Sequence, residues 1–278
     1  MRNFFLLSCL IILLTACQAA PPQPSTVETL SPPPVISETP LPTTSEVPLP
    51  SQPENSPSPT PTETVYAPDM VIEEDYWQQD YWTDDGVLLL RASIAWPKLS
   101  NDFPAALRVY FNDMSDADKQ AAERLSARAR EALSGSPENF TAYSWEKNYT
   151  VERNDGTYLS VLFDETEYTG GVHGDESVWA VNCQVSDGDA NLSLDDHFTV
   201  NPDVWLKRLP DLICAQIAAD AEDYYPNYEQ LVLDNWGVFC LTDTGLAFFY
   251  EPYILGPYTL GVCRFDIPFE AYEDIWKD

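Results

Sequence analysis

Residues 18–66 limit where this chain can fold more than any other part of the sequence. The segment contains fourteen prolines, fifteen serines or threonines and five glutamates, and it has no lysine or arginine. So little apolar surface cannot offset the entropy cost of ordering a chain, and proline removes backbone donors while favouring polyproline II. The composition predicts a disordered tether over 17–66, so the folded part should begin near residue 67.

The first sixteen residues have the layout of a signal peptide. Arg2 is followed by eleven uncharged, mostly apolar residues from Phe4 to Leu14. A transmembrane helix needs about 20 apolar residues, so this run is too short to span a bilayer. A plain membrane span and a peptide cleaved to release a soluble protein are the alternatives. We predict a signal peptide over 1–16.

The end of that run, Leu14-Thr15-Ala16-Cys17, resembles the lipobox of bacterial lipoproteins. The resemblance implies cleavage before Cys17 and a diacylglyceryl group on its sulfur. Two or three acyl chains on one residue hold a membrane far better than one chain does. The expected location is therefore the extracytoplasmic face of the cell membrane, with the chain anchored by lipid.

Residues 67–278 are long enough for one domain with a sizeable core, and all eight tryptophans lie there. Of the 14 basic and 45 acidic residues in the chain, 13 and 40 fall in this part, a net charge of −27. Such a field repels nucleic acid and attracts cationic proteins. The charge could equally serve solubility or reflect an acidic host composition.

Hydrophobic patterning and turn residues predict an α+β domain. The chain should form an antiparallel sheet built from hairpins, with helices packed on it and without β-α-β units. Helices are expected after the capping pattern from Ser115 to Asp118, reaching Leu133, and after Asn201, broken or kinked at Pro210 and resuming to Glu222. A short helix should follow Pro268. The expected strands cover residues 87–96, 143–152, 157–164, 177–185, 237–241, 246–250 and 259–267.

Motifs for catalysis are missing from the sequence. His173 and His197 are the only histidines, and no metalloprotease, nucleophile-elbow, phosphate-loop or dinucleotide pattern occurs. Carboxylate pairs suitable for glycoside hydrolysis exist by chance among so many acids and carry no information. We predict a protein that is not an enzyme and that needs no cofactor.

Metal binding is not expected either. The run Asp187, Asp189, Asn191 and Asp195 alternates like a calcium loop, but the sixth position is Leu192 and the twelfth is Phe198, so the EF-hand pattern fails. Asp195, Asp196 and His197 are adjacent and cannot all face one ion on a strand.

The domain's four cysteines lack the close spacing of a zinc or redox motif. These residues are Cys183, Cys214, Cys240 and Cys263. An exported protein could pair them in three ways. Four reduced, buried thiols are the other possibility, and the sequence does not choose between them.

Three segments carry a family resemblance: residues 168–174 (YTGGVHG), 192–198 (LSLDDHF) and 248–258 (FFYEPYILGPY). Together they resemble the extracytoplasmic domain of RsiV-type, lysozyme-responsive anti-sigma factors. A similar domain precedes the catalytic domain in PdaC-type peptidoglycan deacetylases. The resemblance covers about residues 85–275. His197 stands where the family usually has an aliphatic residue, and the four cysteines are not a family feature. We expect neither an anti-sigma segment nor a deacetylase domain in this chain.

The resemblance implies that two loops form one binding surface for a cationic, lysozyme-like envelope hydrolase. Consecutive glycines permit positive φ in a tight turn, and prolines stiffen a loop so that its tyrosines can act as anchors. An ordinary turn and tyrosines packed over the core remain the alternatives. So do a peptidoglycan-binding or structural wall module and an accessory to a peptidoglycan-modifying enzyme. The predicted partner-binding residues are Tyr168, Gly170, Gly171, His173, Pro252, Tyr253, Pro257 and Tyr258.

Overall fold

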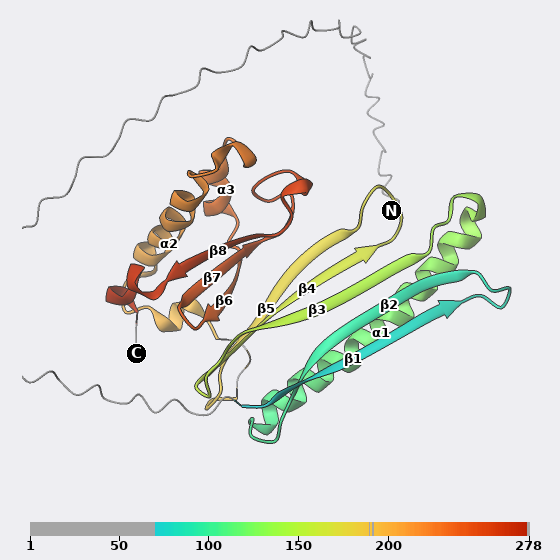
Figure 1. The fold of residues 1–278 in the computed structure, drawn as a ribbon, viewed down its shortest axis with the longest axis horizontal. Coiled ribbons are helices and arrows are strands. Elements are labelled where there is room, and N and C mark those ends of the chain that lie inside the picture. The colour runs from blue at the N-terminus through green and yellow to red at the C-terminus, as the bar shows by residue number, and fades with distance from the viewer. Residues whose placement is uncertain (1–69, 189, 191, 277–278) are drawn as a thin grey trace, which may run out of the picture. The chain divides into compact units, whose positions relative to one another are not determined.

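The computed structural model describes residues 70–188, 190 and 192–276. The predicted signal peptide, the lipidation of Cys17 and the tether lie outside these residues and stay predictions. The described part is α+β, with two β-sheets and three α-helices (Figure 1), which confirms the predicted fold class. No helix of this part is both long enough and apolar enough to cross a membrane.

The first sheet has five strands in chain order. They are β1 (Ile72–Trp82), β2 (Leu88–Leu99), β3 (Tyr143–Asn154), β4 (Tyr158–Tyr168) and β5 (Asp175–Gln184). The predicted hairpin between β3 and β4 is confirmed, with a φ of +79° at Gly156 in its turn. The predicted antiparallel pairing of β4 with β5 is confirmed as well.

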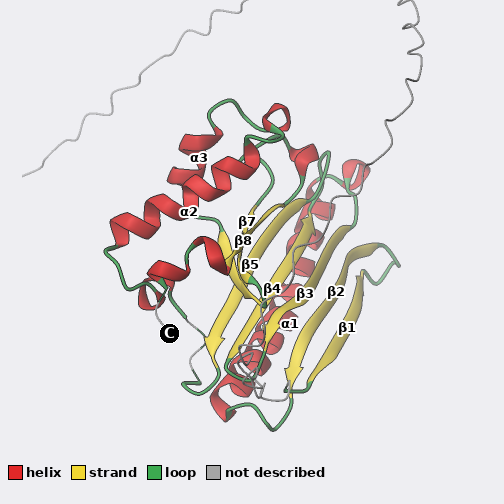
Figure 2. Cartoon of the chain, turned by 60° about the vertical axis from the view of Figure 1, so that its left-hand side comes forward, coloured by secondary structure: helices red, strands yellow, loops and turns green. Residues whose placement is uncertain are grey.

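One pairing in this sheet corrects the sequence prediction. β2 and β3 run parallel, and α1 (Ala105–Gly135) connects them as a β-α-β crossover that lies across the sheet (Figure 2). Parallel neighbours require such a connection. The sequence prediction also missed β1, because most of its side chains are exposed and show no regular alternation. β1 is an edge strand of the sheet.

Helix α1 begins ten residues before the predicted start. Ser115 is buried inside the helix and does not cap it. The physical reason is the apolar stripe, which starts at Leu107 and Phe111 and continues through Ala122, so burial outweighs the local capping pattern. The helix ends at Gly135, just before Pro137, as predicted.

The second sheet has three antiparallel strands, β6 (Val238–Thr242), β7 (Gly245–Tyr250) and β8 (Cys263–Pro268). The predicted hairpin between β6 and β7 is confirmed. β8 starts later than predicted because Tyr258–Leu260 forms a 3-10 turn. The predicted short helix after Pro268 is replaced by two 3-10 turns, Phe269–Ala271 and Glu273–Ile275.

Two helices flank the second sheet, α2 (Pro202–Ile217) and α3 (Tyr228–Asp234). Of these, α3 was not predicted from the sequence. The predicted cap of α2 is confirmed, because the side chain of Asn201 accepts a hydrogen bond from the backbone N–H of Asp203 at 3.0 Å. Of the predicted break or kink at Pro210, the break is wrong. The helix continues through this residue and ends at Ile217, short of Glu222.

The two sheets meet through polar side chains that serve the free edge of β6. The Ser160 hydroxyl accepts from the backbone N–H of Leu241 at 3.1 Å, and the Asn182 amide donates to the carbonyl of Phe239 at 2.8 Å. Unpaired backbone groups of a buried edge are costly, so these contacts favour one docking geometry. Nearby, Arg264 Nη1 lies 2.6 Å from Glu152 Oε1. The junction therefore fixes how loops from the two sheets face each other.

Three of the four domain cysteines, Cys214, Cys240 and Cys263, are free thiols. Burial raises the pKa of the Cys240 thiol to about 12, which disfavours the reactive thiolate. Of the two possibilities that the sequence left open, the structure has the thiol form at these positions.

Candidate functional site

The two loops singled out in the sequence lie against each other in the structure. The first loop, residues 168–174, leads from β4 to β5, and the second loop, residues 251–258, follows β7 (Figure 1). His173 joins them, because its Nε2 lies 3.0 Å from the hydroxyl of Tyr253. Its ring also stacks on Tyr258 with centroids 3.9 Å apart and planes inclined by 19°.

The backbone of the first loop needs its glycines. Gly170 and Gly171 have φ of +105° and +104°, as their sequence predicted. Gly174 is close-packed, since a Cβ there would lie 3.0 Å from the Thr166 methyl carbon. The Tyr168 hydroxyl donates to the carbonyl of Gly171 at 3.2 Å and ties the turn to the end of β4.

The second loop holds Tyr253 in a strained conformation. Its φ is +69°, a region that costs a non-glycine residue about 1–2 kcal/mol. Such strain persists only where surrounding contacts fix it. Here the hydroxyl reaches His173, while the Glu251 carboxylate accepts from the backbone N–H of Val178 in β5 at 3.1 Å.

The protonation of His173 follows from its partners. Nδ1 lies 2.8 Å from the carbonyl oxygen of Gly174, which can only accept, so we assign the proton to Nδ1. In the neutral ring Nε2 then accepts from the Tyr253 hydroxyl. The imidazole thus acts as a fixed link between the loops.

Tyr258 is anchored beneath the histidine. Its hydroxyl lies 2.8 Å from a carboxylate oxygen of Glu176 and 3.2 Å from the carbonyl of Gly174, both of which accept. The pKa of Tyr258 is raised, first by the hydrogen bond to Glu176 and then by burial. Tyr253 and Tyr258 are 5.6 Å apart between ring centroids, so the loops share one aromatic cluster.

The outer side of this cluster is open. Val172 is 99 % exposed in the first loop, and Tyr253, which contacts the neighbouring His173, is 54 % exposed in the second loop. Val172 is not among the predicted binding residues, although an apolar residue inside a glycine-rich turn is a usable signal. Glu176 and Glu251 are not among them either, because their roles depend on contacts between distant segments. We call the surface formed by Val172, His173, Tyr253 and Tyr258 the loop-pair surface.

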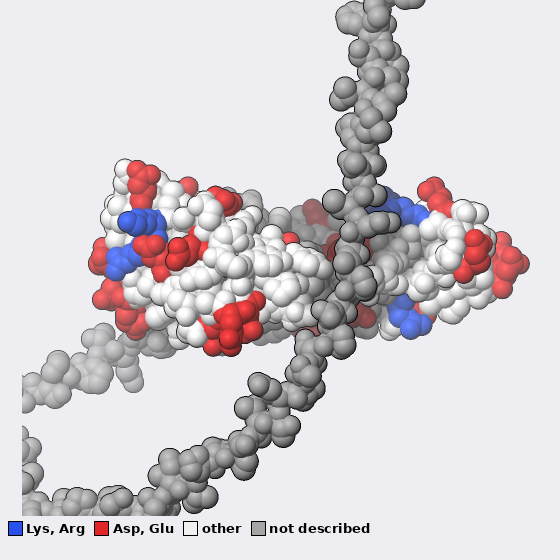
Figure 3. Space-filling model, turned by 90° about the horizontal axis from the view of Figure 1, so that it is seen from above, with Lys and Arg blue, Asp and Glu red and all other residues white. Residues whose placement is uncertain are grey.

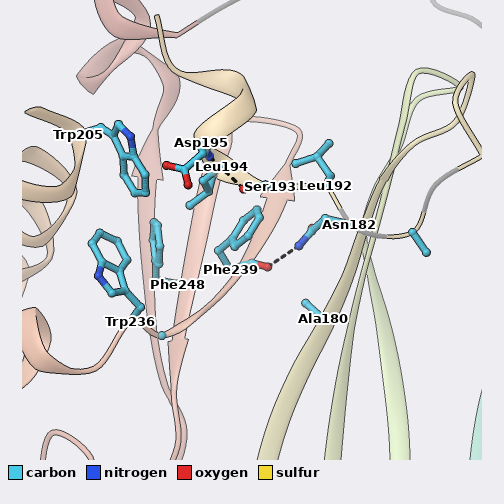
Figure 4. Close-up of a pocket in the computed structure, with 12 residues that line it drawn as sticks. Ala180, Asn182, Leu192, Ser193, Leu194, Asp195, Trp205, Trp236, Phe239 and Phe248 are labelled. Atoms are coloured by element: carbon cyan, nitrogen blue, oxygen red, sulfur yellow. Dashed lines mark hydrogen bonds between the residues drawn. The ribbon is translucent and has the colours of Figure 1, made fainter. Parts of the chain in front are cut away.

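A second feature is an apolar pocket of about 440 Å³ beside β5 and β6 (Figure 4). The rings of Trp205, Trp236 and Phe248 gather at one side, and Asn182 faces them from β5. Asp195 is the single charged residue among those lining it. The arrangement offers hydrophobic contact and no pair of groups for acid-base chemistry.

The residues weighed as metal ligands and set aside in the sequence form no ligand cluster among those that the structure describes. In the described ranges, no three histidine, cysteine or acidic side chains are grouped so as to hold an ion. Asp189 and Asn191 of the calcium-like run lie outside those ranges, as does the side chain of Asp196. His197 stacks on Trp276 with ring centroids 5.1 Å apart. The absence of an enzymatic role stays a prediction.

Comparison with known proteins finds two family models, each of which matches part of the chain. Residues 195–270 match the family model described as a protein of unknown function, DUF3298. Residues 88–176 match the model described as deacetylase PdaC. The first match spans the second sheet and α2, while the second spans β2 to the first loop. The loop-pair surface therefore joins segments from both matched regions.

Two solved structures share this fold. A DUF3298 family member from Bacteroides fragilis has 19% identity and a TM-score of 0.55, covering 76% of this chain and 95% of its own. A DUF3298 family protein from Pseudomonas aeruginosa has 16% identity and the same TM-score of 0.55, covering 75% of this chain and 96% of its own. At such identities the likeness shows the fold alone. No curated protein matches the chain.

Proposed function

We propose that this protein is a lipid-anchored receptor on the extracytoplasmic face of the membrane. Its domain binds a cationic envelope protein without catalysing a reaction, and a lysozyme-like hydrolase is the best single candidate. One observation carries the proposal: His173 links two loops that are 80 residues apart and leaves Val172 and Tyr253 open to solvent.

Preorganisation is the first argument in support. Association normally costs free energy to order loops and side chains, and this cost is small where contacts within the free protein already hold them. The stack of His173 on Tyr258 and the hydrogen bond to Tyr253 hold the two rings in place. Fixed tyrosines are frequent hot spots of protein interfaces.

Charge is the second argument. Asp175, Glu176 and Glu251 lie on or beside the two loops, within a domain whose net charge is −27. Figure 3 shows the same excess elsewhere, with several acidic patches and few basic ones on the face drawn. Such a field accelerates encounter with a cationic protein, and salt weakens this effect.

Resemblance is the third argument. The loops resemble segments of the domain by which RsiV-type anti-sigma factors respond to lysozyme, and lysozyme is cationic. The PdaC match over residues 88–176 includes the first loop, so the resemblance extends to part of the surface itself. Only the class of partner is proposed from this resemblance, because the two solved structures, at 19% and 16% identity, show the fold alone.

The test is a titration with lysozyme at low and at physiological ionic strength. Binding by charge attraction alone is weak at about 0.15 M salt, where the screening length is about 8 Å. Binding in which the tyrosines pack into a complementary groove of the partner persists at this salt concentration. Tyr253→Ala should cost about 2 kcal/mol, near thirtyfold in Kd. The matched control is Tyr76→Ala on β1, since Tyr76 is 55% exposed and Tyr253 is 54% exposed.

Val172→Ser provides a variant that leaves folding intact, because this side chain makes no use of its apolar surface within the domain. It should weaken lysozyme binding severalfold and leave the unfolding curve unchanged. If binding vanishes at physiological salt, or if the Tyr253 and Tyr76 variants bind alike while folded, the receptor proposal fails.

A further inference from the structure

We propose a second binding site, which takes a short uncharged saccharide, in a pocket at the opposite end of the sheets from the loop-pair surface. The pocket has a volume of about 830 Å³ and lies between the β3–β4 hairpin, the β6–β7 hairpin and the turn after β8. This volume falls in the range of about 300–1,000 Å³ that is usual for small-molecule sites.

The position of this pocket separates it from the loop-pair surface. Tyr158, which lines the pocket, begins β4, and Tyr168 of the first loop ends the same strand. Eleven residues at about 3.3 Å each place the two sites roughly 30 Å apart. The second sheet repeats the pattern, because Gly245 of the pocket begins β7 and the second loop follows its end.

Aromatic rings form the wall of the pocket. Phe269 is 38% exposed and packs edge-on against Tyr272, with centroids 5.4 Å apart. Tyr272 in turn lies 5.6 Å from Trp276. Tyr158 of β4 lines the same pocket, and the Arg153 guanidinium covers its ring at 4.9 Å. Such a wall suits a ligand with flat apolar faces.

Hydrogen-bonding groups with unused capacity line the same space. Tyr272 is 2% exposed, yet its hydroxyl makes no hydrogen bond within the described part of the chain. The carboxylates of Asp243 and Glu270 also have no ion-pair or hydrogen-bond partner among the residues described. Arg153 is already neutralised by Asp155, 2.6 Å away. The pocket therefore offers both donors and acceptors beside its aromatic wall.

This combination selects a saccharide over other small ligands. A sugar ring has apolar C–H faces and a rim of hydroxyls, each of which both donates and accepts. A purely apolar ligand would remove water from Asp243 and Glu270 and would offer no hydrogen bonds in place of those that the water had made. An anion would face the same two carboxylates. A small cation would leave most of the volume unfilled and would meet Arg153 at the wall.

The experiment uses the full chain with chitotriose and cellotriose as probes, followed by NMR of the tryptophan indole N–H signals. Trp276→Phe identifies the signal of Trp276. Either trisaccharide should shift this signal saturably, and Phe269→Ala should weaken that binding at least tenfold. Trp236→Ala is the control, because Trp236 is a 42% exposed aromatic residue that lines the other, apolar pocket.

The result that overturns the inference is a Trp276 signal that stays still with both trisaccharides at millimolar concentration. A shift caused by tetramethylammonium alone would overturn it too, since the site would then recognise cations. The Tyr253→Ala variant should bind the trisaccharides like the wild type. The outcome is therefore independent of whether lysozyme binds the loop-pair surface.

Discussion

The two halves of the domain place a helix on a sheet in different ways. In the N-terminal half, residues 70–188, α1 packs an apolar stripe on the sheet and also covers a buried charge: Lys147 is 3% exposed and lies 2.5 Å from Asp118 of α1. The indole of Trp96 donates to the same carboxylate at 2.7 Å. In the C-terminal half, residues 192–276, α2 and the sheet meet through fully buried apolar residues, such as Leu209 of α2 and Phe248 of β7.

This difference teaches where each half is sensitive. A buried ion pair is costly to desolvate but fixes one arrangement, because a lone charge left in the core is far worse than the pair. Lys147 is further enclosed by the ring of Trp179, 4.7 Å from its nitrogen. An apolar core depends on filled volume and tolerates changes that keep it. The first half should therefore be sensitive to loss of one charge as well as to loss of volume, and the second to loss of volume.

The largest effect should come from Asp118→Ala. Removing the carboxylate leaves Lys147 buried without its partner, which should cost about 3–5 kcal/mol of the free energy of unfolding. The matched control is Glu73→Ala in the Lys98–Glu73 pair, whose side chains are 60% and 65% exposed. That loss should stay below about 1 kcal/mol. Urea unfolding followed by circular dichroism measures both.

The double variant Asp118→Leu with Lys147→Met sharpens the comparison. If desolvation dominates, apolar residues of similar volume should restore stability to within about 1 kcal/mol of the wild type or exceed it. A loss as large as that of Asp118→Ala would mean that the first half requires the charge pair itself. Equal costs for Asp118→Ala and Glu73→Ala would remove the contrast between the halves.

A somewhat smaller effect is expected from Leu209→Ala in α2. Leu209 is fully buried against the second sheet, so the cavity left behind should lower the free energy of unfolding by about 2–5 kcal/mol. Val204→Ala on the same helix is the control, because Val204 is 45% exposed and should change stability by about 0.5 kcal/mol or less. Thermal unfolding of the two variants decides the point. Similar melting temperatures would show that α2 does not rely on filled volume.

Local signals in the sequence predicted the parts of the fold that local chemistry determines. Asp155 and Gly156 predicted a hairpin because the turn needs a positive φ, and Asn201 predicted a helix start because its side chain can cap one. The start of α1 was wrong because the capping pattern at Ser115 is also local, while the stripe that buries it depends on the sheet.

Contacts between distant segments account for what could not be predicted. β1 has no alternation because most of its side chains are exposed, and the parallel partner of β2 is set by the path of α1 over the sheet. The family resemblance indicated both loops. The glycines and prolines within them indicated rigid turns. The hydrogen bond from Tyr253 to His173 spans 80 residues, and no pattern within either loop contains it.

The smallest effect concerns the contact that joins the halves, and Tyr258→Phe tests it. This change removes the hydroxyl shared between Glu176 and Gly174 while keeping the ring under His173. Global stability should hardly change, but amide exchange in residues 168–174 should become severalfold faster, as read by mass spectrometry. Tyr76→Phe, at an exposed tyrosine of β1, should leave that exchange as it is.

The same contact predicts a direction with pH. Because the hydrogen bond to Glu176 raises the pKa of Tyr258, the protonated hydroxyl is favoured in the folded protein. Its contribution is fully present below the ordinary tyrosine value of about 10 and is lost as the pH rises through the raised folded value. Tyrosine ionisation is followed by absorbance while the pH is raised. The difference between the wild type and Tyr258→Phe should show one tyrosine that ionises at a higher pH than the exposed tyrosines do. The opposite outcome is that Tyr258 ionises together with the exposed tyrosines and that amide exchange in the first loop is the same in the Tyr258→Phe variant. In that case Tyr258 does not hold the two halves together, and the loop-pair surface depends on His173 alone.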